Sequence, residues 1–258
     1  MTAVYNFATI NERISLGRLN EEVRILARIF QATHVGKVRH NNEDSLIVIE
    51  PETFVVADGM GGASAGEVAS QMLVETVKEF LSETPPPYNE KILMQAIAIA
   101  NNKILELARQ NVEYHGMGTT ATILYLNGKQ AYFAHVGDSR IYRLRGDSLE
   151  QITEDHSYVE TLVRRGELTH EAARVHPMKN VLTQAVGAMD ELYIDAANFP
   201  VETSDTFLLC TDGLTNMVDD ENIKKILQTA PNPADALIDA ALSAGGRDNV
   251  SVIVVGVD

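Results

Sequence analysis

Two apolar runs in this sequence end at an acidic residue followed by glycine. Residues 54–57 lead into Asp58, and residues 207–211 lead into Asp212. A short apolar run bounded by turn residues is typical of a strand buried on both faces. Each Asp-Gly pair alone also fits ordinary turn chemistry, because glycine adopts positive φ and aspartate bonds its own backbone. A functional interpretation therefore depends on further acidic residues in the same setting.

Three more acidic sites lie at the ends of apolar segments. Glu43 and Asp44 precede residues 46–49, Asp138 follows residues 134–137, and Asp248 precedes residues 250–255. Strand ends in a sandwich gather at two rims, so these side chains can meet although they are distant in sequence. Clustered carboxylates repel one another and raise their own pKa values, so such a cluster implies a bound cation.

The residue types indicate which cation. The histidines and the single cysteine, Cys210, do not occur at the spacings of zinc sites. Carboxylate, carbonyl and water oxygens suit hard ions such as Mg2+ or Mn2+. Two such ions bind a shared water and hold the attacking and leaving oxygens of a displacement at phosphorus. The pattern therefore predicts metal-assisted hydrolysis of a phosphoester.

Length and composition favour one large domain. The chain has 258 residues, of which 45% are hydrophobic, and no linker divides it. The run 85–87 of three prolines reads as a loop between two helices. We expect an N-terminal extension at 1–30, which packs on the body, and a catalytic domain at 31–258. The polar, histidine-rich residues 155–180 are expected to form a partly helical flap beside the site.

The charge balance excludes some partners. Lys and Arg number 21 and Asp and Glu number 36, which gives a net charge of −15. This disfavours nucleic acid and requires a local cation such as Arg39 to capture a phosphoryl group. The sequence shows neither a secretory signal nor an apolar run long enough to span a bilayer, so we expect a cytoplasmic protein. Cys210 is expected to be a small buried hydrophobe.

Hydrophobic periodicity and turn signals predict a mixture of strands and helices. Strands are expected at 46–49, 54–57, 119–126, 130–136, 141–145, 148–153, 207–211 and 250–257, and helices after Ser64, after Asn89, at 219–229 and at 233–244. Asn127-Gly128 is a strong hairpin signal between two of these strands. Because strands and helices do not alternate regularly, antiparallel sheets with helices outside are favoured over a doubly wound parallel sheet.

Six short motifs in a fixed order connect these observations with a known family. They are RHNNED (39–44), DGMGG (58–62), GMGTT (116–120), VGDSR (136–140), TDGL (211–214) and GRDN (246–249). With these six motifs in this order, the sequence resembles the bacterial PP2C-type (PPM) metal-dependent serine/threonine protein phosphatases. The resemblance covers most of the chain and leaves out about the first thirty residues.

The resemblance implies an α+β fold, a four-layer α-β-β-α sandwich of two antiparallel sheets flanked by helices. It also implies a centre of two Mn2+ or Mg2+ ions at one end, and a third ion in some bacterial relatives. Asp58 would bridge the two ions and the Gly59 carbonyl would bind one of them. The remaining ligands would be Asp212 and Asp248 at one ion, Glu43 and Asp44 at the other, and Asp138 with Asp212 at the third.

The resemblance implies that Arg39 binds the phosphate group of the substrate. A metal-bridging hydroxide would attack the phosphoserine or phosphothreonine ester in line, without a phosphoenzyme. One position departs from the family pattern, because Ala63 replaces a histidine thought to protonate the leaving group. Either a metal-bound water or another residue would then have to supply the proton. His176 in the flap is the expected substitute, although its place before a proline fits a structural turn equally well.

Three functions are compatible with these residues. The first is an active phosphatase that acts, as a monomer, on phosphoproteins made by serine/threonine kinases, without a nucleic acid or membrane partner. The second is a pseudophosphatase that uses the metal site to stabilise a signalling scaffold, and its sole support is Ala63. The third is a phosphatase dedicated to one regulatory phosphoprotein.

Overall fold

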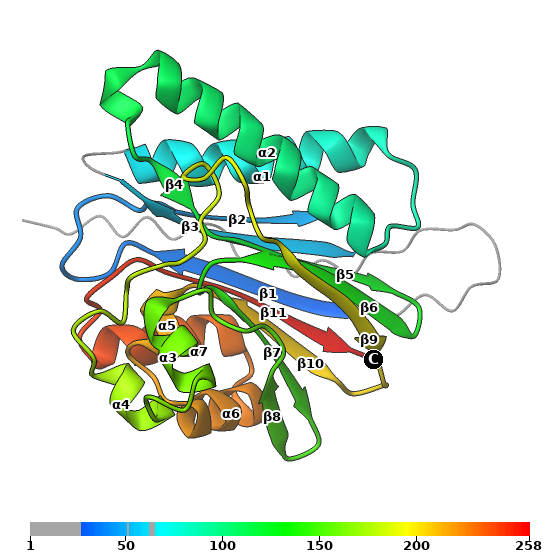
Figure 1. Cartoon of the computed structure of the whole chain (residues 1–258). Coiled ribbons are helices and arrows are strands. Elements are labelled where there is room, and N and C mark those ends of the chain that lie inside the picture. The colour runs from blue at the N-terminus through cyan, green and yellow to red at the C-terminus, as the bar shows by residue number, and fades with distance from the viewer. Residues whose placement is uncertain (1–26, 51, 62–64) are drawn as a thin grey trace, which may run out of the picture.

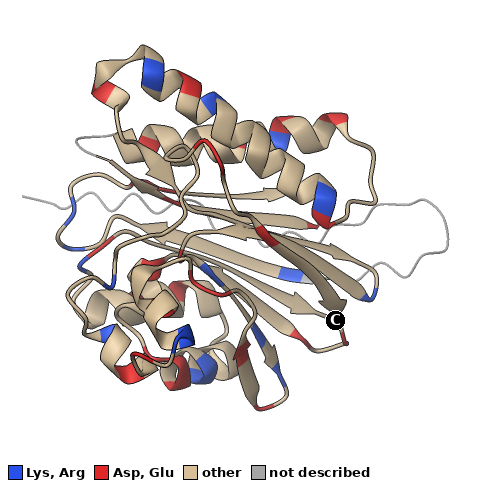
Figure 2. Ribbon diagram, in the orientation of Figure 1, with Lys and Arg blue, Asp and Glu red and all other residues tan. Residues whose placement is uncertain are grey.

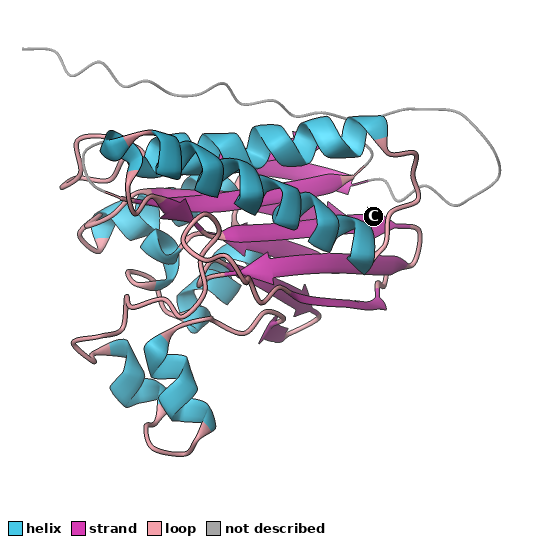
Figure 3. Ribbon diagram, turned by 45° about the horizontal axis from the view of Figure 1, so that its top comes forward, coloured by secondary structure: helices cyan, strands magenta, loops and turns pink. Residues whose placement is uncertain are grey.

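The computed structural model describes residues 27–50, 52–61 and 65–258. Two antiparallel β-sheets pack face to face in the middle of the molecule, and helices cover the outer face of each sheet (Figures 1 and 3). The predicted four-layer α-β-β-α sandwich is therefore confirmed. Charged residues lie mostly in helices, loops and sheet edges, and the central strands carry few of them (Figure 2).

The first sheet joins the two ends of the described chain. Its strand order is β1-β11-β10-β7-β8, and all neighbouring strands are antiparallel. The strands are β1 (Ala27–His34), β7 (Arg140–Arg145), β8 (Ser148–Gln151), β10 (Thr206–Cys210) and β11 (Val250–Val257). Because β1 pairs with β11 along its whole length, residues 27–30 belong to the sheet rather than to the extension predicted at 1–30.

The second sheet has the order β2-β3-β5-β6-β9, with the short β4 paired to the end of β3. The strands are β2 (Asp44–Ile49), β3 (Thr53–Met60), β4 (Gly118–Thr119), β5 (Ala121–Asn127), β6 (Gln130–Val136) and β9 (Asp195–Pro200). The hairpin predicted at Asn127-Gly128 connects β5 to β6. The predicted strand 119–126 is divided at Thr120, which lies between β4 and β5.

Helices form the two outer layers. They are α1 (Ala65–Glu83) and α2 (Glu90–Gln110) on the second sheet, followed by the 3-10 turn η1 (Val112–Tyr114), and α5 (Asp212–Thr215), α6 (Asp220–Thr229) and α7 (Pro233–Ser243) beside the first sheet. Asn89 caps α2 as predicted, since its side chain accepts the Ile92 amide. The capping residue predicted for α1, Ser64, lies outside the described residues.

Apolar side chains fill the three spaces between the four layers. In β3, Phe54 and Val56 face the other sheet, whereas Val55 and Ala57 face α1 and α2. This alternation explains why the strand is an uninterrupted apolar run, since both of its faces are buried. Cys210 is fully buried between the first sheet and its helices, as predicted.

The structure differs from the sequence-based prediction in a strand limit and in strands that were not predicted. β3 does not end before Asp58 but continues to Met60, because β4 pairs with Gly59 and Met60 and prolongs the ladder. β1 and β9 were not predicted. β9 consists mostly of small and polar residues at the edge of its sheet, so it lacks the apolar signal of a central strand.

The flap predicted at 155–180 is partly helical. It contains α3 (Tyr158–Arg164) and α4 (His170–Arg174). An isolated β-bridge between Ser157 and Leu182 closes its base. Within the described part of the chain, no helix combines the length and the apolar character needed to cross a membrane.

Candidate metal centre

The strand ends that carry the predicted acidic residues surround one cavity of about 290 Å³, here called the acidic cavity. Its lining residues are Arg39, Glu43, Asp58, Gly59, Met60, Gly61, Thr120, Asp138, Asn180, Leu182, Asp212, Asp248 and Asn249. The fold therefore brings together most of the residues singled out in the sequence. Two of them, Asp44 and His176, are not among the lining residues.

Asp44 lies buried at the first position of β2, with 9% of its surface exposed. Its Oδ2 accepts hydrogen bonds from the Thr211 hydroxyl at 2.9 Å and the Ser251 hydroxyl at 2.7 Å. Its Oδ1 has no hydrogen-bond partner. Burial raises the pKa of Asp44 to about 7, and the charges of Asp212 and Asp248 add to the effect. An unpartnered buried carboxylate oxygen is costly unless a cation or a proton neutralises it.

Asp58 and Gly59 lie in β3 where the strand passes under the start of α1. A Cβ atom on Gly59 would lie 2.1 Å from the Gly66 carbonyl oxygen and 2.4 Å from that of Glu43. Only glycine allows this close approach of three backbone segments. The Gly59 amide donates to the Glu43 carbonyl at 3.1 Å, so the two predicted ligand loops are tied together.

The carboxylates of the cavity destabilise one another's charged forms. Burial raises the pKa of Asp58 well above its usual range, and Asp44, Asp212 and Asp138 add to the shift. Burial and the charge of Asp212 also raise the pKa of Asp138 well above its usual range. For Asp212, burial and then Asp248 raise the pKa to about 6. The predicted repulsion within the cluster is therefore present in the folded chain.

Arg39 supplies a positive charge to the cavity. Its Nη2 donates to Asp248 Oδ2 at 2.9 Å, and about half of the Arg39 side chain is exposed. Burial raises the pKa of Glu43, which the nearby Arg39 opposes. Arg39 is thus already held among the acidic residues, with an exposed guanidinium that can exchange partners.

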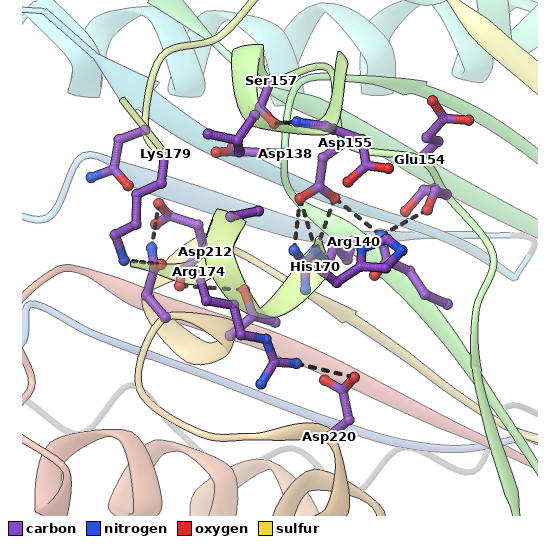
Figure 4. A pocket seen from close by; sticks show the side chains of 18 of the residues that line it. Asp138, Arg140, Glu154, Asp155, Ser157, His170, Arg174, Lys179, Asp212 and Asp220 are labelled. Atoms are coloured by element: carbon purple, nitrogen blue, oxygen red, sulfur yellow. Dashed lines mark hydrogen bonds and ion pairs between the residues drawn. The ribbon is translucent and has the colours of Figure 1, made fainter. Parts of the chain in front are cut away.

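Asp138 and Asp212 also line a second, larger cavity of about 700 Å³ beneath the flap, here called the flap cavity. Figure 4 shows Lys179 reaching from the flap toward the Asp212 side of this cavity. Lys179 Nζ donates to Asn216 Oδ1 at 2.6 Å, and Asn216 Nδ2 donates to Asp212 Oδ2 at 2.8 Å. A hydrogen-bonded chain therefore connects the flap to Asp212.

His176 is not brought to either cavity. It follows α4 in the flap, and its Nδ1 accepts the backbone amide of Met178 at 3.1 Å. The prediction that His176 supplies a proton thus stays a prediction, and it requires the flap to move. Ala63, the position of the missing family histidine, lies outside the described residues.

The donor set of the acidic cavity fits a hard divalent ion. All predicted ligand atoms are oxygens, and several of the carboxyl groups have raised pKa values. Asp44 does not line the cavity, but it lies opposite Asp58 in the paired strands β2 and β3, and its buried Oδ1 has no partner. Among the described residues, however, no three His, Cys, Asp or Glu side chains converge on one point at ligand distance. Asp248 and Asp212 are turned toward Arg39 and Asn216, so metal binding would require local rotation of side chains.

Several supporting residues were not predicted as part of the site. The Asn249 amide donates to the carbonyls of Val35 and Asn41, and its Oδ1 accepts the Glu43 amide. Thr211 and Ser251 hold Asp44. The sequence shows these residues as polar positions inside or beside apolar strands. Because buried polar groups are generally hydrogen-bonded, such positions indicate a network of hydrogen bonds at the strand ends.

Comparisons with known proteins agree with this geometry. The model of the protein phosphatase 2C family matches residues 34–243. The serine/threonine phosphatase stp of Listeria innocua is 41% identical over 234 residues, which cover 86% of this chain and 93% of that protein.

Two solved structures show the same fold. The structure of the Mycobacterium tuberculosis serine/threonine phosphatase PstP/Ppp has a TM-score of 0.85 and 36% identity, covering 91% of this chain and 100% of the other. The PstP catalytic domain in complex with two manganese ions has a TM-score of 0.83 and 35% identity, with the same coverage of 91% and 100%. On its sequence, fold and acidic cavity, this chain belongs to the protein phosphatase 2C family.

Proposed function

We propose that this protein removes phosphoryl groups from phosphoserine and phosphothreonine in other proteins by metal-dependent hydrolysis. The observation that carries the proposal is the acidic cavity, where Asp58, Asp138, Asp212 and Asp248 face one space beside Arg39. The relatives described above bear the names of serine/threonine phosphatases, and one solved relative holds two manganese ions. Among the residues that the structure describes, nothing favours the alternative of an inactive scaffold.

The proposed ligands divide between the two sheets. Asp58 would be shared by two ions, and the Gly59 carbonyl would bind one of them. Glu43 and Asp44 would complete the centre on the second sheet, and Asp212 and Asp248 on the first. Asp138 together with Asp212 would hold a third ion, because both line the acidic cavity and the flap cavity.

When bound, divalent ions supply Lewis-acid activation of water and of the phosphoryl group. The chain's own residues do the rest. The exposed guanidinium of Arg39 has the planar set of donors that suits a phosphate group. It would exchange Asp248 for the phosphoryl oxygens and so orient the ester in the cavity.

Mn2+ is the ion we expect first, and Mg2+ is expected to replace it because both prefer oxygen ligands. The proposed substrates are the products of serine/threonine kinases. The cytoplasmic location and the monomeric state expected from the sequence remain predictions, as does the role of His176.

Release of phosphate from synthetic peptides tests the function. Phosphoserine, phosphothreonine and phosphotyrosine peptides of the same sequence would be compared with Mn2+, with Mg2+ and with EDTA. We expect turnover of the first two peptides with either metal and none with EDTA. Equal turnover with EDTA, or a clear preference for phosphotyrosine, would contradict the proposal. Metal binding without turnover of any peptide would favour the scaffold alternative.

A further inference from the structure

A buried pair of hydroxyl groups lies directly behind two of the proposed ligands. Thr120, between β4 and β5, is 2% exposed, and Ser139, which follows Asp138, is 0% exposed. Their Oγ atoms are 2.7 Å apart. Thr120 Oγ1 also accepts the backbone amide of Asp58 at 2.8 Å. One hydroxyl group thus contacts both the Asp58 backbone and the segment that carries Asp138.

The methyl group of Thr120 contacts the other side of Asp138. Gly137 has a φ of +107°, and a Cβ atom on it would lie 2.5 Å from Thr120 Cγ2. Thr120 therefore contacts both neighbours of Asp138: its methyl group contacts Gly137 and its hydroxyl group contacts Ser139. Its side chain lies between the strand that carries Asp58 and the loop that carries Asp138.

The backbone of Asp58 is held on both of its polar groups. Besides its amide, its carbonyl accepts the Thr120 amide at 2.9 Å and the Thr119 hydroxyl at 3.0 Å. These hydrogen bonds restrain both the amide and the carbonyl group of Asp58. The same two threonines therefore hold the backbone from which the Asp58 side chain projects.

From these contacts we infer that Thr120 is a positioning residue that sets the separation of the Asp58 and Asp138 carboxylates. The inference rests on the proposed metal centre. The two carboxylates repel each other, so a loosened scaffold would let them move apart, and an ion would then have to bring them together again. Outer residues that orient metal ligands affect metal affinity by about 10- to 100-fold.

Two substitutions at Thr120 separate its two contacts. Thr120→Val keeps the branched shape against Gly137 but removes the hydroxyl, whereas Thr120→Ser keeps the hydroxyl and removes the methyl group. Thr153 offers a matched control, because it is 3% exposed and its Oγ1 also accepts a backbone amide, that of Ile141, at 3.1 Å. Thr153→Val therefore causes the same kind of loss at a position that does not contact Asp58.

The experiment is calorimetric titration of the full chain and its variants with MnCl2, together with thermal melting in EDTA. We expect Thr120→Val to bind Mn2+ about tenfold more weakly than the wild type. Thr120→Ser and Thr153→Val should stay within about twofold of the wild type, although Thr153→Val melts at a lower temperature. A purely structural role of Thr120 would lower the melting temperature without this selective loss of affinity.

The outcome separates the inference from the function on which it rests. If the wild type binds no Mn2+, both the metal centre and the inference fail. If the wild type binds Mn2+ but Thr120→Val and Thr153→Val bind it equally well, the inference alone fails. Should Thr120→Val not fold, Ser139→Ala removes the other hydroxyl of the pair and is expected to weaken Mn2+ binding in the same direction, while unchanged affinity in this variant would overturn the inference.

Discussion

Asp44 and Asp58 occupy directly opposite positions in the antiparallel pair of β2 and β3. Opposite residues in such a pair project from the same face of the sheet, and like charges there are destabilising. The fold therefore keeps two acidic groups together at a buried strand end. This arrangement is stabilised only when a proton or a cation compensates the charge, which leads to the following predictions.

The first prediction concerns pH in the absence of metal. The pKa of Asp44 is raised by burial to about 7 in the folded chain, above its value in the unfolded chain. The folded state therefore binds the proton more tightly, and this contribution to stability is lost as pH rises through about 7. The free energy of unfolding would be measured with urea in EDTA at several pH values. As pH rises toward 7, the wild type should lose stability relative to Asp44→Asn, which cannot titrate at this position. Parallel pH profiles for the two proteins would contradict the prediction.

The second prediction concerns metal and stability. Because Mn2+ binds the folded cluster, an excess of 100 times the dissociation constant should stabilise the fold by about 2.7 kcal/mol. For a domain of this size the melting temperature should rise by about 5–10 °C over that in EDTA. Differential scanning calorimetry measures the shift, and K+ at equal ionic strength is the control. The same melting temperature in Mn2+ and in EDTA would argue against the site.

The third prediction concerns Gly59. Replacing it with alanine places a Cβ atom within 2.4 Å of the backbone of both Glu43 and Gly66. Neither backbone can yield easily, so Gly59→Ala should cost about 3 kcal/mol of stability and weaken Mn2+ binding. Gly116→Ala is a suitable comparison, since its Cβ atom meets nothing within 4 Å although its φ is +79°. Chemical denaturation should show the larger loss for Gly59→Ala; a loss no larger than that of Gly116→Ala would be inconsistent with the packing described.

The fourth prediction concerns Arg39. If its guanidinium binds the phosphoryl group, Arg39→Ala should lower kcat/KM for a phosphothreonine peptide by about 50-fold, the value expected for one charged hydrogen bond. Mn2+ affinity should not fall, because Arg39 is not a proposed ligand and its removal frees the Asp248 carboxylate. Arg174→Ala removes another exposed arginine, which pairs with Asp220 in α6, and serves as the control. An equal loss of kcat/KM in both variants would refute the specific role of Arg39.

The fifth prediction concerns the flap. Lys179 reaches Asp212 through Asn216, whereas Arg174 reaches Asp220, so two flap residues of the same charge contact the body at different places (Figure 4). Lys179→Met should strengthen Mn2+ binding by about two- to fivefold, because it removes a positive charge near Asp212 and loosens the Asn216 side chain that holds this carboxylate. The change is modest because the contact is exposed. Arg174→Met should leave Mn2+ affinity unchanged. Identical titration curves for both variants would show that the contact of Lys179 has no effect on the site.

Much of this architecture could be predicted from the sequence. The central strands are continuous apolar runs because both of their faces are buried, and turn residues mark their ends. The acidic residues at those ends were recognisable because Asp and Glu are unusual beside such runs. β9 gave no comparable signal, because an edge strand of small and polar residues looks like a loop.

Other features depend on contacts that periodicity does not encode. That β3 continues through Asp58 follows from its pairing with β4, which lies about sixty positions further along the chain. Thr120 and Ser139 acquire their importance from a contact between two loops. The position of His176, away from both cavities, depends on how the flap folds on itself through the Met178 amide.

The central claim is that the acidic cavity is the catalytic metal centre, and one comparison tests it most directly. Hydrolysis of a phosphothreonine peptide in Mn2+ would be measured for the wild type, for Asp58→Asn and for Asp147→Asn, an exposed residue in the turn after β7. We expect full activity in Asp147→Asn and a loss of at least about a thousandfold in Asp58→Asn, with its fold retained. Activity of folded Asp58→Asn near that of the wild type would contradict the account.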